Sequence, residues 1–130
     1  MTADSKTDTS PRPRIGLDMV VLDTDDPPRM ADFYTALLGW QVETTEDGWI
    51  TLHGDGDARI AFQLALNHKP PTWPDNEVPQ QVHFDFTVDD MEAASAYAVS
   101  IGARPVEGPV SVESFRVFLD PSGHPFCLCR

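Results

Sequence analysis

The segment VVLDTDDPPRMADFYTALLGW, residues 20–40, predicts a strand, a tight turn and a helix in direct succession. Apolar and β-branched residues run from 15 to 24, as is typical of a strand buried on both faces. Asp26 is a good N-cap, and Pro27 suits the first helical position. Gly39 then ends the helix, because glycine readily adopts the left-handed conformation found after a helix C-terminus.

The predicted helix has one apolar face. Its large apolar side chains recur at helical spacing, and they are Met30, Phe33, Tyr34, Leu37 and Leu38. After the helix, residues 40–43, 49–53 and 59–66 alternate or run apolar, with Gly48 and the polar stretch GDGD between them as turns. The first half therefore predicts a strand, a helix and three further strands.

The second half of the chain repeats this plan. Residues 81–88 predict a strand, and either Asp89 or Asp90 caps a helix that ends at Gly102. Three residues of the first helical region recur 63 positions later, namely Asp26, Tyr34 and Gly39 as Asp89, Tyr97 and Gly102. Strands are then expected at 104–106, 115–119 and 125–129. Such self-similarity indicates a duplicated supersecondary unit.

These patterns divide the chain into a tail and one domain. Residues 1–14 are polar and rich in Ser, Thr and Pro, so we expect a disordered tail there. The domain spans 15–130, with a first module at 15–66 and a second at 81–130. A proline-rich crossover loop at 67–80 joins them, and its Trp73 either closes over a cleft or covers the join between the modules.

Charge and composition exclude several classes of protein. With 21 acidic and 9 basic residues the formal net charge is −12, which disfavours nucleic acid and anionic membrane surfaces as partners. No signal peptide or membrane span is recognisable, so we expect a cytoplasmic protein. Cys127 and Cys129 are expected to be free thiols, because a bridge between them would close a very small, strained loop.

Common catalytic motifs are missing from the sequence. It contains no G-x-S-x-G elbow, no H-E-x-x-H helix, no C-x-x-C pair and no phosphate-binding loop. The function must therefore be sought in a different arrangement of residues.

Two segments, VVLDTDDPPRMADFYTALLGW and FRVFLDPSGHPFCLC (residues 115–129), resemble the vicinal oxygen chelate superfamily, and its glyoxalase-like branch in particular. This superfamily includes glyoxalase I, extradiol dioxygenases, fosfomycin-modifying enzymes and bleomycin-binding proteins. The resemblance implies an α+β fold in which two βαβββ modules form a curved mixed sheet around a cleft. It also implies a divalent metal in the cleft and a homodimer, because such clefts are often completed across a subunit interface.

The resemblance places four metal-ligand positions on the first and last strands of the two modules. They fall on Met19, Gln63, His83 and Cys127, where the family uses His, Glu and Gln. A thioether is a poor ligand for a hard cation, and Cys127 stands where Glu would be expected. Two outcomes stay open, namely a site without metal or a divalent ion, most plausibly zinc, held by Gln63, His83 and Cys127.

Asp85 adds a carboxylate to the expected cleft. His83 and Asp85 are two residues apart on a predicted strand, so both side chains should face the same way. Asp85 is either a buried general base or a carboxylate paired with His83 or with an arginine. The remaining histidines, His53, His68 and His124, lie in or beside turns, and we expect them to be solvated.

Two functions fit these observations. One is a glyoxalase-like lyase or isomerase with His83 and Asp85 as catalytic residues. The other is a metal-free protein that sequesters a drug or natural product, as bleomycin resistance proteins do, with its acidic surface attracting a cationic ligand. In either case a small molecule would contact Met19, Gln63, Trp73 and Cys127, with Trp40 and Trp49 as further stacking candidates. An interaction protein without a ligand would need an exposed apolar face that the sequence does not reveal.

Overall fold

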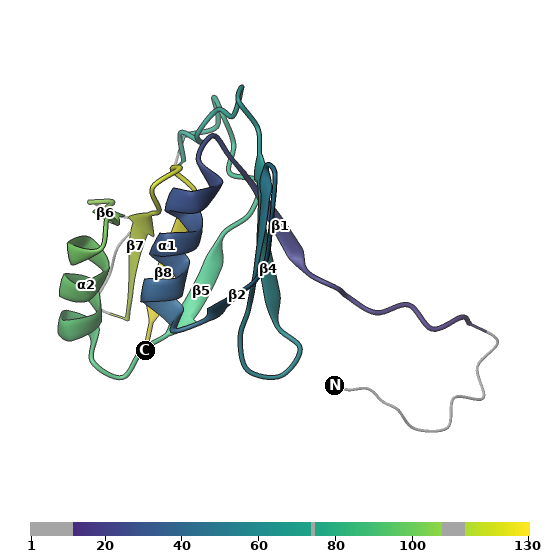
Figure 1. Cartoon of the computed structure of the whole chain (residues 1–130). Coiled ribbons are helices and arrows are strands. Elements are labelled where there is room, and N and C mark those ends of the chain that lie inside the picture. Colours follow the sequence, from purple (N-terminus) through teal and green to yellow (C-terminus); the bar gives the residue numbers. More distant parts are fainter. Residues whose placement is uncertain (1–11, 74, 108–113) are drawn as a thin grey trace.

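The computed structural model describes residues 12–73, 75–107 and 114–130 (Figure 1). Most of the predicted tail, residues 1–11, lies outside the described residues. In chain order the elements are β1 (Val20–Thr24), α1 (Pro27–Leu38), β2 (Gln41–Glu46), β3 (Trp49–His53), β4 (Arg59–Leu64), β5 (Phe84–Thr87), α2 (Met91–Ser100), β6 (Arg104–Pro105), β7 (Phe115–Leu119) and β8 (Pro125–Cys129). This order confirms the α+β fold and the βαβββ plan of each module.

The strands form two sheets of four strands with matching topology. The first sheet has the order β1-β4-β3-β2, and the second has the order β5-β8-β7-β6. In each sheet the first strand of the module pairs in parallel with the last, and the remaining pairs are antiparallel. The equivalent pairings show that the two halves share one topology. Across the described part of the chain, no helix combines the length and the apolar character needed to traverse a lipid bilayer.

Strand β1 is shorter and more exposed than predicted. It begins at Val20, and the side chains of Ile15 and Leu17 before it are 77% and 86% exposed. Within β1 burial alternates, with Leu22 buried and Val21 exposed. The prediction of burial on both faces was wrong because only the inner face of the first sheet is packed against a helix.

The helix ends follow the sequence signals, except that the C-cap of α2 is Ile101 and not Gly102 as predicted. The Asp26 carboxylate accepts a hydrogen bond from a backbone N–H of the first turn of α1, and Pro27 occupies the first turn. Gly39 has a φ of 71°, the left-handed conformation expected at the C-cap. In α2 the N-cap is Asp90 and not Asp89, since the Asp90 carboxylate accepts a hydrogen bond from a backbone N–H of the first turn.

Helix α1 lies between the two sheets and packs against both (Figure 1). The Tyr34 ring stacks on Phe62 of β4 with centroids 5.6 Å apart, and it meets Phe84 of β5 edge-on at 6.0 Å. Phe33 contacts Phe126 of β8 at 5.9 Å. Since these aromatic rings come from both modules, they form one continuous core around α1.

A buried polar group joins the modules beside this core. The Tyr34 hydroxyl donates to Asp120 Oδ2 at 2.7 Å, and Asp120 Oδ1 accepts the backbone N–H groups of Ser122 and His124. The hydroxyls of Thr24 and Ser122 are 2.6 Å apart, which ties the end of β1 to the β7–β8 turn. Burial raises the pKa of the Asp120 carboxyl and raises that of Tyr34 well above its ordinary value.

Two histidines expected to be solvated belong to this join. His124 is 4% exposed, and its Nε2 donates to the carbonyl of Asp23 at 2.8 Å. The Nε2 atom of His68, in the crossover loop, lies 3.0 Å from the carbonyl oxygen of Ser122. The ring centroids of His68 and His124 are 4.9 Å apart. The expectation of solvation was wrong for His124, and for His68 in part, because the crossover loop folds back over the β7–β8 turn.

Gly123 permits that close approach. Its φ of 88° favours glycine, and a Cβ at this position would lie 2.7 Å from the Pro70 Cβ. The root of the crossover loop therefore packs directly on the backbone of the β7–β8 turn.

Replacing Tyr34 by Phe should lower the free energy of unfolding by about 1–3 kcal/mol, because it removes the hydroxyl donor of a buried carboxylate. Tyr97→Phe is the matched control, since the Tyr97 hydroxyl donates to the Ala36 carbonyl at 2.8 Å in an exposed position. That loss should stay below about 1 kcal/mol. Urea denaturation of both variants measures the difference, and equal losses would contradict a special role for the Tyr34–Asp120 pair.

Candidate functional site

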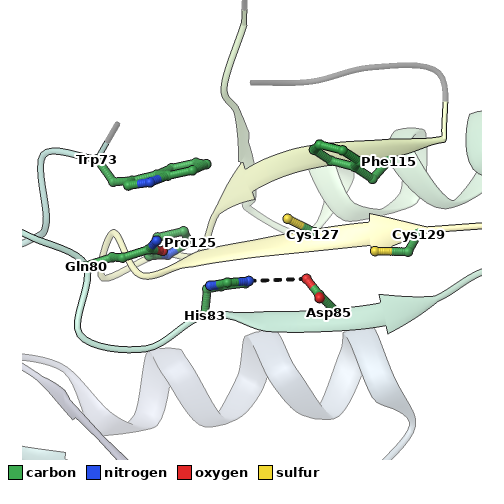
Figure 2. A pocket seen from close by; sticks show the side chains of 8 residues that line it. All are labelled: Trp73, Gln80, His83, Asp85, Phe115, Pro125, Cys127 and Cys129. Atoms are coloured by element: carbon green, nitrogen blue, oxygen red, sulfur yellow. Dashed lines mark ion pairs between the residues drawn. The ribbon is translucent and has the colours of Figure 1, made fainter. Parts of the chain in front are cut away.

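The outer face of the second sheet carries the polar residues singled out in the sequence (Figure 2). Phe84 and Phe86 of β5 point to the core around α1, so the alternating positions His83 and Asp85 point outward. The His83 Nε2 atom lies 3.4 Å from Asp85 Oδ1. His83 comes immediately before β5, because this strand begins at Phe84 and not at residue 81 as predicted. The two side chains share one face, as the sequence indicated, and they are paired.

Cys127 joins them through the strand register. Strand β8 runs parallel to β5 with Asp85 directly opposite Cys127. As a result, one ligand-type atom each from His83, Asp85 and Cys127 lies within 4.8 Å of the other two. An imidazole, a carboxylate and a thiol are thus brought together within the second module.

These side chains form part of the wall of a cavity of about 410 Å³, a volume typical of a small-molecule site. Trp73 reaches it from the crossover loop, and Phe115 projects from β7 on the same side of the cavity (Figure 2). His83 and Asp85 lie across from the two aromatic rings. The full lining consists of Trp73, Gln80, His83, Asp85, Phe115, Pro125, Cys127 and Cys129.

The two thiols of the pocket are free and protonated at neutral pH. Desolvation by burial, reinforced by the nearby Asp85 carboxylate, raises the pKa of the Cys127 thiol to about 11. Burial also raises the pKa of Cys129, and Asp85 contributes in the same direction. Neither cysteine therefore has the lowered pKa of an activated nucleophile.

Sequence reasoning missed four of the lining residues as site residues, namely Gln80, Phe115, Pro125 and Cys129. Phe115 pairs with Cys129 across the β7–β8 ladder, so strand alternation would have found it had the register been known. Gln80 lies in an irregular segment and has no periodic signal. Its buried amide oxygen has no hydrogen-bond partner among the described residues, which leaves an acceptor available at the pocket wall.

Met19 and Gln63 lie on the other sheet. Phe62 of β4 faces α1, so the adjacent Gln63 points away from the helix, and its side chain is exposed. Met19 directly precedes β1 in that same sheet. Neither residue lines the pocket around His83. Within one chain, the pocket thus brings together His83, Asp85, Cys127 and Trp73. Met19 and Gln63 lie apart from them.

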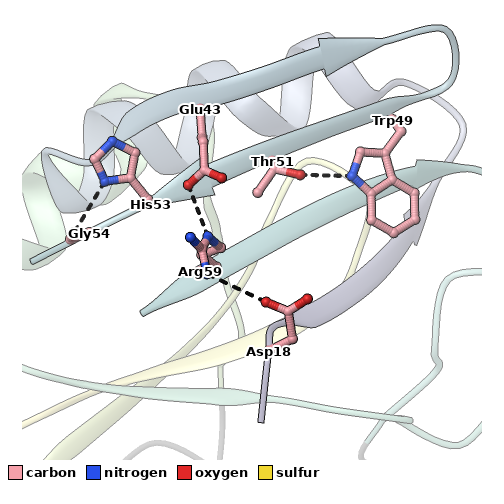
Figure 3. Close-up of polar contacts among 7 residues, drawn as sticks. All are labelled: Asp18, Glu43, Trp49, Thr51, His53, Gly54 and Arg59. Carbon is pink, nitrogen blue, oxygen red and sulfur yellow. Dashed lines mark hydrogen bonds and ion pairs between the residues drawn. The ribbon is translucent and has the colours of Figure 1, made fainter. Parts of the chain in front are cut away.

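The outer face of the first sheet has its own polar contacts (Figure 3). The Trp49 indole N–H donates to the Thr51 hydroxyl at 2.7 Å, and Trp49 lies opposite Gln63 in the ladder. Arg59 pairs with Glu43 at 2.9 Å on the same sheet. Trp40 is part of the core and packs closely on Gly54. Of the three tryptophans, Trp73 is the one that lines the pocket.

The four superfamily positions do not provide the donors that a hard divalent metal needs. The four positions supply a thioether, an amide, an imidazole and a protonated thiol, without any carboxylate, and they are divided between two sheets that carry α1 between them. A hard divalent cation requires oxygen ligands and favours charged ones. These residues do not fit such an ion, so the hard-metal chemistry of the superfamily is not built into these four positions.

The fold and the sequence together identify a protein of the vicinal oxygen chelate superfamily. A sequence model described as a glyoxalase-like domain matches residues 19–129, and the chain belongs to this glyoxalase-like family. Two solved structures with this fold are a glyoxalase/bleomycin resistance protein/dioxygenase family enzyme from Burkholderia phytofirmans PsJN and a glyoxalase family protein from Enterococcus faecalis. The first has a TM-score of 0.65 at 21% identity, covering 85% of this chain and 94% of that one. The second has a TM-score of 0.66 at 18% identity, covering 88% and 97%.

Two curated relatives have names that connect them with antibiotic biosynthesis. The anthracycline biosynthesis protein DnrV of Streptomyces peucetius is 29% identical over 122 residues, covering 84% of this chain and 44% of the relative. The anthracycline biosynthesis protein DauV of Streptomyces sp. strain C5 matches with the same identity and coverage. The chain thus spans less than half the length of these relatives.

The position of Asp85 beside Cys127 predicts how the thiol reacts. In a Cys129→Ser background, Cys127 should be alkylated slowly by iodoacetamide at neutral pH, because its pKa is about 11. Asp85→Asn should increase the rate, since removal of the carboxylate charge lowers the pKa of the thiol. Asp89→Asn gives the same change in net charge outside the pocket. If mass spectrometry across a pH series finds the Asp85 and Asp89 variants alike, the inferred contact is wrong.

Proposed function

We propose that the protein binds a small organic molecule in the pocket on the outer face of the second sheet. The observation that supports this most directly is the composition of its wall. Trp73 and Phe115 contribute aromatic surface, while His83 and Asp85 contribute polar groups on the opposite side. A largely apolar cavity with a few convergent polar groups is the usual form of a small-molecule site.

The same groups suggest the chemistry of the ligand. Trp73 and Phe115 favour a flat ring system, because aromatic faces bind such rings by stacking. The Asp85 carboxylate and the net charge of −12 favour a ligand that carries an amine or another cationic group. The relatives named for anthracycline biosynthesis support a natural product of this general kind.

Binding is better supported than metal-dependent catalysis, because the four positions of the superfamily site lack ligands for a hard metal. Proton transfer is a second candidate, favoured by the 3.4 Å approach of Asp85 to His83. In that case Asp85 would orient the His83 imidazole, and the ring would exchange a proton with the bound molecule. A lyase or isomerase reaction of this type would convert the ligand, whereas a sequestering protein would release it unchanged.

Binding can be tested with a panel of cationic polycyclic aromatic compounds, with tryptophan fluorescence as the readout. Trp73→Ala and His83→Ala should each weaken binding at least about tenfold, since one removes a stacking face and the other a hydrogen-bonding group. Val99→Ala, on the exposed side of α2, should bind like the parent protein. Unchanged affinity in both pocket variants would exclude this cavity as the binding site. Analysis of the recovered compound distinguishes binding from turnover.

We also propose that two chains form a homodimer in which the outer faces of the two sheets meet. Aromatic side chains of α1 contact the inner faces of both sheets, so the Gln63 face and the His83 face are directed away from one another within a chain. A second copy could place its Gln63 face over the pocket. Val21 lies on the same face of the first sheet as Gln63, is 38% exposed, and would supply apolar contact. The match covers 44% of each anthracycline biosynthesis relative, so each relative is long enough to contain two domains of this size. Two such domains in one chain could pair as the two chains of the proposed homodimer do.

Light scattering after size-exclusion chromatography should therefore give twice the chain mass of 14.4 kDa. Val21→Asp should shift the protein to monomer, because it places a charge in the proposed interface. Val99→Asp makes the same change at a 47% exposed site on α2 and should leave the dimer intact. A monomeric parent protein, or equal behaviour of the two variants, would contradict this interface.

A further inference from the structure

The pocket contains a group of side chains that can hold a metal in a way that the four superfamily positions cannot. We propose that His83, Asp85 and Cys127 together bind a thiophilic divalent cation of the zinc class within the second module. The proposal concerns the same pocket as the proposed function, but it does not depend on the organic ligand. It uses Asp85, which lies outside the superfamily pattern, and it requires no residue of the first sheet.

The donor chemistry selects the ion. Zinc accepts a mixture of imidazole nitrogen, carboxylate oxygen and cysteine sulfur, whereas magnesium and calcium are bound by oxygen ligands. In a tetrahedral zinc site the donor atoms lie roughly 3.5 Å from one another. His83 Nε2 and Asp85 Oδ1 are already 3.4 Å apart, and the Cys127 sulfur lies within 4.8 Å of both. Small side-chain rotations would close the remaining gap.

Regular structure holds two of these donors, and the third directly precedes a strand. Asp85 and Cys127 are direct neighbours in the parallel β5–β8 ladder, and His83 precedes Asp85 by two residues on the same face. Backbone pairing therefore sets the spacing of Asp85 and Cys127, and the start of β5 one residue later positions His83. A site built on paired strands is more precise than one built on loops.

The group is also accessible to an ion. The side chains of His83 and Asp85 are 43% and 62% exposed, so a hydrated cation can reach them from solvent. Three protein ligands leave one tetrahedral position for water or for an oxygen atom of a bound molecule. Binding requires the Cys127 thiolate, so it releases a proton from the thiol.

The test is a titration of the full chain, purified without affinity metal and treated with EDTA before the chelator is removed. Cobalt(II) chloride should produce a thiolate-to-cobalt charge-transfer absorption at one ion per chain, and zinc chloride should abolish it. Magnesium chloride in large excess should not abolish the absorption. Asp85→Asn, His83→Ala and Cys127→Ser should each reduce cobalt affinity more than about tenfold, the minimum loss typical of even an outer-shell partner.

Two variants distinguish this site from its alternatives. Cys129→Ser removes the other thiol of the pocket, which lies outside the group of three donors, and should keep the absorption. Gln63→Ala should also keep it, because His83, Asp85 and Cys127 hold the ion without the Gln63 amide, even where a second chain covers the pocket. Loss of affinity in Gln63→Ala would show that the metal is shared between the modules and would overturn the proposal. Absence of the absorption in the parent protein, or its persistence in Cys127→Ser, would overturn it as well.

Circular dichroism of the variants shows whether each is folded, and Asp85→Asn is informative even if a Cys127 variant unfolds. The organic-ligand titration is carried out separately in the presence of EDTA. Failure of metal binding with retained ligand binding would thus reject the metal site alone, and the reverse result would reject the proposed ligand function alone.

Discussion

The structure depends on the burial of Tyr34 between the two sheets. Its ring packs on Phe62 and Phe84 from different modules, while its hydroxyl donates to the buried Asp120 carboxylate. Aromatic contact alone would allow the helix some freedom of rotation, but a short hydrogen bond to a fixed turn removes it. Because α1 fills the space between the sheets, their outer faces become the surfaces available for function. The location of the pocket thus follows from how the core is built.

The pocket combines the strand pairing of the superfamily fold with a different set of side chains. The residues at the four superfamily positions do not suit a hard cation, yet the strand pairing that brought two of them together is intact. Asp85 lies opposite Cys127 in the ladder and is paired with His83, so it adds a carboxylate to the same space. The sheet fixes where side chains project, and substitution of those side chains changes which ion or molecule can be held there.

Local features of this fold could be predicted from the sequence, and features that depend on distant packing could not. The Asp26 and Gly39 caps were correct because capping involves only neighbouring residues, and the shared face of His83 and Asp85 follows from strand periodicity. The burial of His124 depends on a loop that returns from the other module, which no local pattern encodes. For the same reason Phe115 and Gln80 were missed, and the separation of Gln63 from His83 became visible only when the placement of the two sheets was known.

The contact between Gly123 and Pro70 fixes where the crossover loop begins to cover the second module. Its root is held by a glycine in the opposite module, and Trp73 lies farther along, at the pocket wall. Substitutions, or even changes in length, beyond the root can alter the pocket wall without disturbing the packing below it. The loop therefore offers a route by which homologous chains can acquire new ligands while the modules retain their common framework.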